Sequence, residues 1–399
     1  MTHRKKTRKM IGFILGGLIL LLLLFLLLLS LADGVFQSAN YLAPWNPDYV
    51  SSASDPRIRL VAKAELAASG HNMQPWRIKL DHEEAQSFYL YADPKRLTLQ
   101  VDPFARQTMI SQGTFLEYLS VAGAHAGYDI RIRLFPKGPY NEDHLKKSMA
   151  ALPVARITLT KGTTPGSKWY PYLFQPDTNR GPYASAKLTS EQLSQLRGLI
   201  HDPDLSLTLY QDTRDLKRLN AFANVGARIE SSVKRISDES AAVFRANEYQ
   251  KNAKSYGYSF EGQGMSGIKM QLLQGLITLF PALNNDQAAS SIFVNSTKNA
   301  TTHTPAYAIL KTKGNSRIDQ VRAGMIYSRL VLEAHRLGLS LQPPSQVLEE
   351  YPEMSRPYHQ IHSDYAQPGE TIQMFVRIGL PLEPAQKSMR QDVHKFLIK

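Results

Sequence analysis

The sequence predicts an α+β protein in which two similar halves follow one N-terminal transmembrane helix. Alternating apolar residues predict strands that are interspersed with helices in both halves. Two long apolar helices carry glycines at the same spacing, and one uncharged apolar stretch precedes the rest. The chain has 399 residues, 43% of them hydrophobic and 20% charged, which suits one large globular domain or two ordinary ones.

The composition excludes several classes of protein. The chain has no cysteine, which rules out disulfides, thiol chemistry and zinc-finger sites. Its net charge is +13, but the basic residues of the main part are dispersed and form no nucleic-acid-binding motif. We therefore expect a solvated basic surface and no nucleic-acid partner. His82, His303 and His359 lack metal-ligand spacing, so no metal site is expected.

Residues 11–32 form the apolar stretch and carry no charge over 22 positions. About 20 apolar residues cross a bilayer as a helix, whereas the core of a signal peptide has only about 7–15. Five basic residues lie in the tail at residues 1–10, and only Asp33 follows the stretch directly. This asymmetry predicts a cytoplasmic tail, an uncleaved single-pass anchor in the cell membrane and an extracytoplasmic main domain. The proline-containing residues 33–54 are expected to be a linker.

The first half is expected over residues 55–165. A helix leads into the polar turn Ser69-Gly-His-Asn-Met-Gln-Pro-Trp76, and a hairpin with a turn at Asp93–Pro94 follows later. The expected elements are a helix at 58–68, strands at 76–80, 88–91 and 97–101, a helix at 111–126, and strands at 129–135 and 154–159. Gly, Thr and Pro at residues 161–168 indicate a boundary.

The second half is expected over residues 178–399. Thr189 and Gln192 form a capping box at the start of its first helix. The expected elements are a helix at 191–200, a strand at 205–209, helical residues at 216–246, a mobile Gly-rich stretch at 257–267, an irregular polar stretch at 284–304, a strand at 306–311, a helix at 317–336 and a strand at 372–378. Residues 225–300, approximately, lack a counterpart in the first half, and we interpret them as an inserted segment.

The two long core helices indicate an internal duplication. Gly113 and Gly127 are 14 positions apart, and so are Gly324 and Gly338. Each helix follows a strand and ends at a glycine, after which an alternating strand and one more strand are predicted. Coincidental α+β patterning remains the alternative.

The two halves differ in the residues that could bind a ligand. The turn at 69–76 is packed with side-chain donors, and such a turn at a helix end can cradle a planar, polar ligand. The equivalent junction of the second half reads His201-Asp202-Pro203. The second half instead has Thr178-Asn179-Arg180 before its first helix, where a guanidinium suits a phosphate.

These features resemble the FMN-dependent nitroreductase superfamily, and most closely its fused, double-lobed branch typified by the mycobacterial Acg proteins. The family turn Ser-Gly-His-Asn-Thr-Gln-Pro-Trp is matched at 69–76, with Met73 in place of Thr, and a Thr-Asn-Arg opening is matched at 178–180. The resemblance covers about residues 40–395. Further matching phrases are Asp93-Pro94-x-Arg96, Asp102-Pro103-x-x-Arg106-Gln107, Arg322-Ala323-Gly324 and Arg377-Ile378-Gly379-Leu380-Pro381.

The resemblance implies a nitroreductase-like fold in which two fused lobes form an intramolecular pseudo-dimer with one FMN site. Such a pseudo-dimer is compatible with a monomer. In the family, one subunit supplies the polar turn, and the other supplies an Arg-rich start and a basic tail. The implied cofactor-binding residues here are Ser69, His71, Asn72, Gln74, Trp76, Thr178, Asn179, Arg180, Ser345, Gln346, Lys387 and Arg390.

The resemblance also implies roles for these residues. Arg180, Lys387 and Arg390 are the candidates for the phosphate, while Asn72 and Gln74 are the candidates for the flavin pyrimidine edge. A backbone N–H at Ser345 or Gln346 would face flavin N5. Trp76 is either a flavin contact or a core residue. The tail at 387–390 departs from the usual Pro-Arg-Arg-Pro-like phrase, which leaves the phosphate ligands open.

The implied function is that of an FMN-dependent oxidoreductase. It would pass electrons through FMN to a small quinone-like or nitro acceptor, and no protein residue need be catalytic, because the flavin performs the redox chemistry. The inserted segment, including Tyr256, Tyr258 and Phe260, would be a lid. A flavin-sequestering protein with an occluded site and a scaffold that has lost its cofactor are the alternatives. An extracytoplasmic domain lacks access to cytoplasmic NAD(P)H, so the electron donor stays open.

Overall fold

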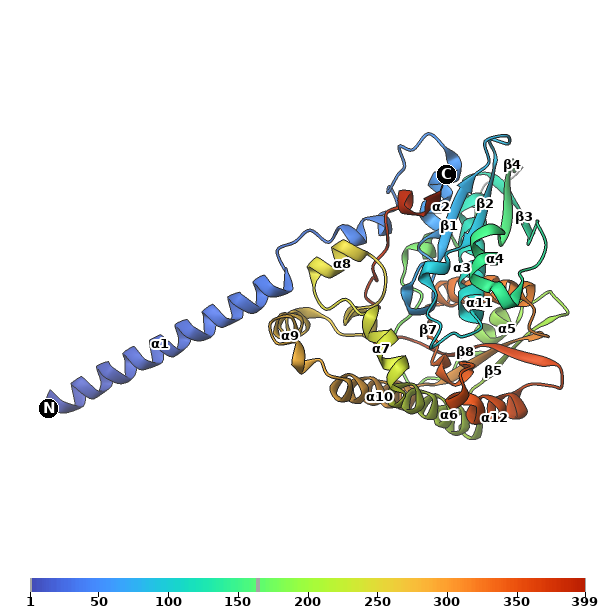
Figure 1. Cartoon of the computed structure of the whole chain (residues 1–399). Helices are drawn as coiled ribbons and strands as arrows, with labels where there is room; N and C mark the ends of the chain where they lie inside the picture. Colours follow the sequence, from blue (N-terminus) through green and yellow to red (C-terminus); the bar gives the residue numbers. More distant parts are fainter. Residues whose placement is uncertain (1, 163–165, 399) are drawn as a thin grey trace.

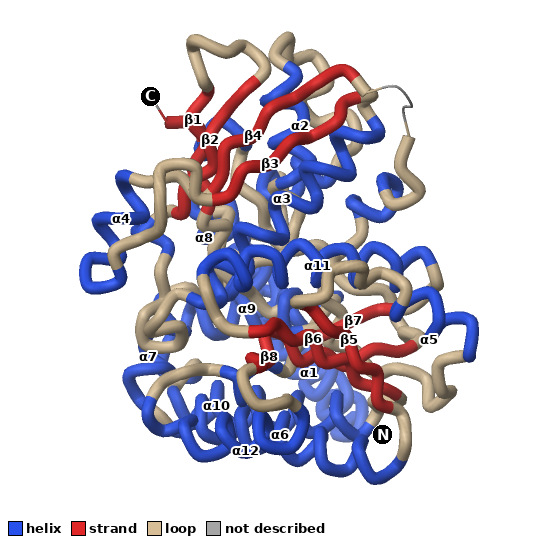
Figure 2. The backbone as a smooth tube through the Cα atoms, turned by 90° about the vertical axis from the view of Figure 1, so that its right-hand side faces the viewer, coloured by secondary structure: helices blue, strands red, loops and turns tan. Residues whose placement is uncertain are grey.

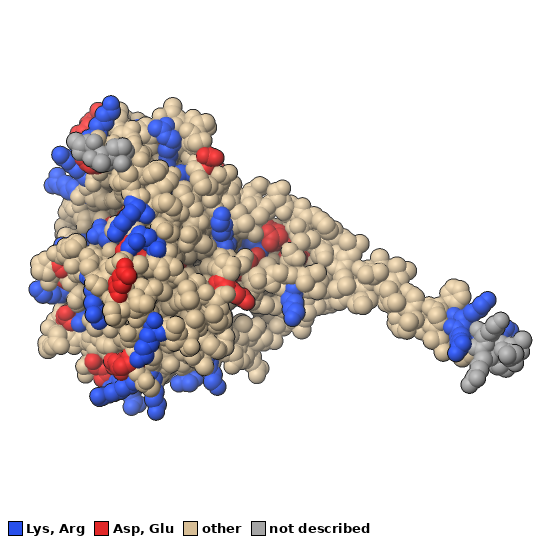
Figure 3. All heavy atoms as spheres, turned by 180° about the vertical axis from the view of Figure 1, so that it is seen from behind, with Lys and Arg blue, Asp and Glu red and all other residues tan. Residues whose placement is uncertain are grey.

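Helix α1 (Thr2–Asp33) projects as one long rod from the rest of the molecule in the computed structural model, which describes residues 2–162 and 166–398 (Figure 1). Within these residues, one helix is long and apolar enough to cross a membrane, and it is α1 from Lys6 to Asp33. The space-filling view shows uncharged side chains along α1 and basic ones near its tip (Figure 3). Residues 163–165, part of the expected boundary, lie outside the described residues.

The main body contains two β-sheets with corresponding strand orders (Figure 2). The first sheet has the order β3-β4-β2-β1-β9 and the second has the order β5-β6-β8-β7. If β1 to β4 are matched in turn with β5 to β8, the two orders are the same. The strands are β1 (Trp76–Leu80), β2 (Ser87–Ala92), β3 (Tyr128–Leu134), β4 (Ala155–Lys161), β5 (Leu205–Tyr210), β6 (Ala306–Lys313), β7 (Ser340–Gln342), β8 (Glu370–Gly379) and β9 (Leu397–Ile398).

Neighbouring strands are antiparallel except for the C-terminal strand β9, which pairs in parallel with β1 through Ile78 and Leu397. The end of the chain therefore returns to the first sheet. Shorter helices accompany the sheets, namely α2 (Pro56–Ala64), α4 (Leu145–Ala151), α5 (Ser190–Arg197) and α12 (Ser355–Tyr365).

Helices α3 (Arg106–His125) and α11 (Arg317–Arg336) pack against each other and join the two halves. A Cβ atom added to Gly113 would lie 1.9 Å from the carbonyl oxygen of Val321, and one added to Gly324 would lie 2.0 Å from that of Ile110. Only glycine permits this approach, because the two backbones are already in contact. Gly113 and Gly324 thus allow the close contact between the two helices.

The inserted segment lies between β5 and β6 and is larger than expected. It spans residues 211–305, whereas only residues 81–86 separate β1 from β2. Its helices are α6 (Thr213–Ser232), α7 (Lys234–Ala242), α8 (Glu248–Lys254), α9 (Gly267–Leu279) and α10 (Asp286–Thr302).

Several elements match the sequence-based expectations closely. Helix α11 has the expected bounds, and the capping box of Thr189 and Gln192 is present at α5. Strands β3 and β5 lie where alternation predicted them, and β6 lies where a strand was expected. The helix expected at 58–68 ends earlier, at Ala64.

Two expectations were wrong. Residues 97–101 form a loop and turn, and β2 instead forms a hairpin with β1, with Trp76 opposite Ala92. The stretch at 284–304 was expected to be irregular but contains α10, which begins at the N-cap Asn285 and packs on α6. Residues 33–54, which were expected to be a linker, include a 3₁₀ helix at Asn40–Trp45 that buries Trp45 to 1% exposure.

Candidate functional site

The turn from Ser69 to Trp76 has an unusual backbone. His71, Asn72 and Gln74 all have positive φ angles, of 49°, 53° and 50°. Such conformations cost about 1–3 kcal/mol each in non-glycine residues and persist where the surroundings enforce them. The hydroxyl of Ser69 accepts a hydrogen bond from the backbone N–H of Gln74 at 2.9 Å, which closes the turn. The turn is therefore held by contacts with the rest of the chain.

The C-terminal tail supplies one set of these contacts. The side-chain amides of Asn72 and Gln74 donate to the carbonyl oxygen of Met389 at 3.0 and 3.2 Å. Gln74 Oε1 accepts from the backbone N–H of Gln391 at 3.0 Å, and Asn72 Oδ1 accepts from Arg390 Nη1 at 2.9 Å. The turn of the first half and Arg390 of the tail, which were expected at one site, are thus brought together.

The inserted segment supplies a second set of contacts. Asn72 Nδ2 donates to the carbonyl oxygen of Gly257 at 2.9 Å, and the N–H of Gly257 donates back to the carbonyl oxygen of Asn72 at 3.0 Å. Gln74 Nε2 donates to the carbonyl oxygen of Ser255 at 2.9 Å. The ring of His71 lies 6.3 Å from that of Tyr258. Both amides are therefore fully engaged by protein groups in this arrangement.

Arg390 is buried to 3% exposure beneath the turn. Its Nη2 donates to the carbonyl oxygen of Leu66 at 2.6 Å, and its guanidinium lies 4.7 Å from the centre of the Trp45 ring. Burial lowers the pKa of Arg390 to about 10, and the nearby Asp177 carboxylate opposes that shift. Its Nε atom has no hydrogen-bond partner among the described residues. Lys387, by contrast, is exposed, with Nζ 5.8 Å from the Trp45 ring.

The segment from Thr178 to Arg180 approaches the inserted segment from the second half. Arg180 Nη1 donates to the carbonyl oxygen of Gly262. Asn179 has a structural role, because its Nδ2 donates to the carbonyl oxygen of Glu383 at 2.8 Å and its Oδ1 accepts from the N–H of Gly181. Thr178 lies beside the phenol of Tyr327, whose hydroxyl has no hydrogen-bond partner among the described residues.

A second arginine accompanies Arg180. Arg377 is fully buried, donates to the carbonyl oxygens of Asn179 and Gly181, and lies 3.9 Å from the centre of the Tyr183 ring. Burial, and then the Arg377 cation, lower the pKa of Arg180. Among the described residues, Arg180, Arg377 and Arg390 form no ion pair with a carboxylate. Arg180 and Arg377 are thus cations that favour an anion beside them, whereas the carboxyl groups of Asp177 and Glu65 already lie near Arg390.

Three titratable groups surround Arg180. Burial, and then the Arg180 cation, lower the pKa of His71 to about 4. Burial raises the pKa of Glu230 to about 7, while the Gln346 side chain and Arg180 oppose that shift. Burial, and then Glu230, raise the pKa of Tyr258 to about 12. These interactions place His71, Gln346 and Arg180 in one neighbourhood.

The sequence did not single out Glu230, and it showed Arg377 only as part of a family phrase. Glu230 lies on the buried side of α6, and its Oε2 atom lacks a hydrogen-bond partner among the described residues. A charged residue on an otherwise apolar helix face is the signal that could have identified it.

The other predicted residues have mainly packing roles. Trp76 is 1% exposed, donates from Nε1 to the carbonyl oxygen of Ser111 at 2.9 Å, and packs on Phe115 with ring centres 5.2 Å apart. Trp76 therefore lies in the core, and its contact with flavin stays a prediction. Ser345 begins a 3₁₀ helix, Ser345–Leu348, and its hydroxyl donates to the carbonyl oxygen of Phe375 at 2.8 Å.

Arg106 and Arg96, which belong to two of the family phrases, make ion pairs. Arg106 lies 3.2 Å from Glu350, and Arg96 lies 3.9 Å from Asp93. Arg96 also lies 3.3 Å from the centre of the Tyr256 ring, so it helps to hold the inserted segment.

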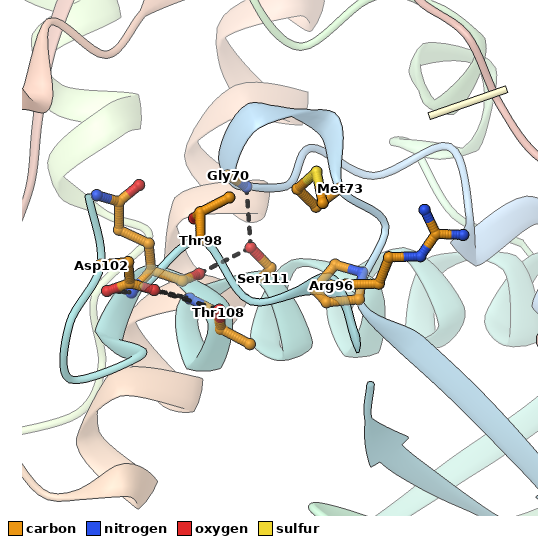
Figure 4. Close-up of a pocket in the computed structure, with 9 residues that line it drawn as sticks. Gly70, Met73, Arg96, Thr98, Asp102, Thr108 and Ser111 are labelled. Carbon is orange, nitrogen blue, oxygen red and sulfur yellow. Dashed lines mark hydrogen bonds between the residues drawn. The ribbon is translucent and has the colours of Figure 1, made fainter. Parts of the chain in front are cut away.

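Two cavities adjoin the site. A cavity of about 10 Å³ lies beneath the turn, where Gly70 donates to the hydroxyl of Ser111 (Figure 4). It is large enough for a water molecule at most. A cavity of about 320 Å³ lies between the linker, the inserted segment and the tail, and is lined by Tyr41, Leu42, Glu261, Ser266, Gly267, Met270, Ala385, Gln386 and Lys387. The described residues contain no cluster of three metal-ligating side chains.

Comparisons with known proteins show similarity to solved structures only. No protein-family model and no curated protein matches the chain. The chain is similar to a nitroreductase with bound FMN from Bacteroides fragilis, with 12% identity and a TM-score of 0.33 over 57% of this chain and 95% of that one. It is similar to a BluB-like flavoprotein from Clostridium difficile, with 11% identity and a TM-score of 0.35 over 59% of this chain and 99% of that one. It is also similar to the FMN-dependent nitroreductase NfnB from Mycobacterium smegmatis in complex with NADPH, with 13% identity and a TM-score of 0.30 over 51% of this chain and 83% of that one.

Proposed function

We propose that this chain is a membrane-tethered, nitroreductase-like oxidoreductase that binds FMN between its two halves. Electrons would pass through FMN to a small quinone-like or nitro acceptor. The observation that carries this proposal is the contact between Arg390 of the tail and Asn72 of the turn, because it joins two segments that the resemblance assigns to one site. The corresponding strand orders of the two sheets support a duplicated, pseudo-dimeric architecture.

The residues suit FMN in two respects. Arg180 offers a guanidinium group without a carboxylate partner among the described residues, and a phosphate would compensate its charge, whereas both Nη atoms of Arg390 already donate to protein groups. Asn72 and Gln74 offer both donors and acceptors, as the flavin pyrimidine edge requires. When bound, FMN supplies the redox chemistry. The chain's own residues bind it, orient it and exclude water.

The arrangement imposes one condition on FMN binding. The amides of Asn72 and Gln74 are engaged with Ser255 and Gly257 of the inserted segment. The same amides are also hydrogen-bonded to Met389, Arg390 and Gln391 of the tail, so ligand binding through them requires both the inserted segment and the tail to move away from the turn. A lid at this place would control access to the site.

The second candidate function is flavin sequestration without efficient turnover. The docking of Ser255 and Gly257 on the turn favours it, because a segment hydrogen-bonded across a site slows exchange of both cofactor and acceptor. We keep this function as the alternative to the oxidoreductase.

The absorption spectrum of the purified, detergent-solubilised full chain tests both functions. A protein that is colourless and takes up no added FMN would exclude them together. Bound FMN that dithionite reduces and a quinone or nitro compound reoxidises supports the oxidoreductase. Bound FMN that undergoes no such cycle supports sequestration. Arg180→Gln should weaken FMN binding by about 10- to 100-fold, the range expected for one charge-assisted contact, whereas Lys187→Gln in the neighbouring exposed loop should not.

A further inference from the structure

Helix α9 packs against the end of α1 where that helix enters the main body. A Cβ atom added to Gly275 would lie 2.2 Å from the carbonyl oxygen of Leu29, so the two backbones are in contact. Small residues allow this approach between helices. Figure 1 shows α9 end-on beside α1, which means that the two axes cross steeply. If α1 stands across a bilayer, α9 lies along the bilayer surface.

The length of α1 places α9 at the edge of the hydrocarbon layer. About 20 helical residues cross that layer. The last basic residue before the apolar stretch is Lys9, so a span that starts at Met10 ends near Leu29, which is the residue that Gly275 contacts. The next charged residue, Asp33, is fully buried within the protein. Helix α9 therefore meets α1 at the boundary between lipid tails and headgroups.

Both faces of α9 are apolar. Met270 and Ile277 are buried and face a small cluster with Phe260. On the other side, the exposed Ile268 is followed at helical spacing by Leu272, Leu276 and Leu279, which are half-buried. Ile268 is 71% exposed, and the stripe continues into Phe280 and Leu283, at 50% and 51%. A helix between protein and water would carry polar residues on that face.

We propose that the outer face of α9, together with Phe280 and Leu283, lies in the lipid bilayer and forms a second membrane contact beside α1. The surface is continuous with the apolar surface of α1, and the exposed Lys269 at its start can reach headgroup phosphates. The cavity of about 320 Å³, which Ser266, Gly267 and Met270 line from the start of α9, would then lie next to the membrane. The proposal rests on the tethering by α1 that belongs to the proposed function.

Spin labelling tests the proposal directly, because the chain contains no native cysteine. Single variants Ile268→Cys, Leu276→Cys and Leu283→Cys of the full chain would be labelled with a nitroxide and reconstituted into phosphatidylcholine–phosphatidylglycerol vesicles. Phe104→Cys is the matched control, since Phe104 is an apolar residue with 59% exposure ahead of α3. A label at Leu21→Cys tests whether α1 itself lies in the bilayer. We expect the three α9 labels to favour oxygen over a water-soluble nickel chelate severalfold more than the Phe104 label.

Each other outcome contradicts the inference in a distinct way. If the α9 labels are as accessible to nickel as the Phe104 label while the Leu21 label is protected, α1 is an anchor but α9 does not enter the bilayer. If the α9 labels are shielded from both reagents, a protein surface covers α9 instead. If the Leu21 label is itself exposed to nickel, the tethering by α1 fails, and the inference fails with it.

Discussion

Arg390 donates from Nη1 to Oδ1 of Asn72 at 2.9 Å, and this contact joins residues that are 318 positions apart. The same guanidinium reaches the carbonyl oxygen of Leu66 at the end of the α2 segment. A few residues later the chain adds β9 to the edge of the first sheet. The tail thus fixes the strained turn in place and ties the end of the chain to its first half.

Replacing Arg390 by Met should destabilise the protein by about 2–4 kcal/mol, because buried acceptors on Asn72 and Leu66 lose their donor. Denaturant unfolding of the main transition measures the change. Arg390→Lys should have an intermediate effect on the free energy of unfolding, since a lysine ammonium cannot donate to Asn72 and Leu66 from two separate nitrogens as the guanidinium does. Lys387→Met is the control, and its exposed side chain predicts a change within about 0.5 kcal/mol. Equal effects of Arg390→Met and Lys387→Met would contradict the structural role of Arg390.

The contact between α3 and α11 predicts that alanine is not tolerated at its glycines. The new Cβ atom of Gly324→Ala would lie 2.0 Å from the carbonyl oxygen of Ile110, a backbone atom that cannot rotate away. We expect a loss of about 3 kcal/mol or more, because the two helices must separate. Gly198→Ala, whose nearest neighbour is a carbonyl oxygen at 3.3 Å, is the control. A melting temperature for Gly324→Ala within a few degrees of the control would show that α3 and α11 can move apart at little cost in stability.

The elements that the sequence predicted well carry their own local signals. Helix α11 has a continuous apolar stripe and a capping box of Ser316 and Asp319, so its bounds follow from local chemistry. Helix α10 has a polar composition, and its packing on α6 stabilises it, which no local pattern reveals. Residues 97–101 alternate as a strand does, but β1 occupies the hairpin position beside β2.

The site was predictable to the extent that motifs marked it. The family resemblance placed the turn at 69–76 and Arg390 at one site, and in the structure Asn72 and Arg390 are in contact, while their binding of FMN stays a prediction. The burial of Glu230 and Arg377 could not be predicted, because it arises where the inserted segment closes over the second half. The engagement of both amides by Ser255 and Gly257 likewise depends on tertiary packing.

Glu230 should make the stability of the protein depend on pH. Its pKa rises from 4.5 in the unfolded chain to about 7 in the folded protein, mainly through burial. The folded state therefore binds more protons between these values, and stability falls as pH rises from 4.5 to 7. Glu230→Gln should remove the contribution of Glu230 to this pH dependence. Above pH 7, the free energy of unfolding of the variant should exceed that of the wild type by at most about 3 kcal/mol. Denaturant unfolding at several pH values measures it, with the exposed Glu83→Gln as the control. If the free energies of unfolding of Glu230→Gln and the wild type differ by the same amount at every pH, Glu230 does not titrate in this range.

The inserted segment should control access to the turn, and Gly257 offers a way to release it. Gly257 has a φ of +86°, and an added Cβ atom would lie 2.1 Å from the carbonyl oxygen of Val243. Gly257→Ala should therefore disturb the two hydrogen bonds between Gly257 and Asn72, so that the segment is cut sooner by protease and FMN enters faster.

Gly262→Ala is the matched control for Gly257→Ala, because it lies in the same segment and its nearest contact would be an ordinary 3.7 Å. Limited proteolysis reports on release of the inserted segment, and stopped-flow quenching of FMN fluorescence reports on entry of FMN. If the inserted segment of Gly257→Ala is cleaved faster but FMN uptake is not faster, release of this segment does not limit FMN entry. Equal behaviour of the two variants would mean that the turn is reached without movement of the segment. Faster uptake confined to Gly257→Ala would identify the contact between Gly257 and Asn72 as the closure of the site.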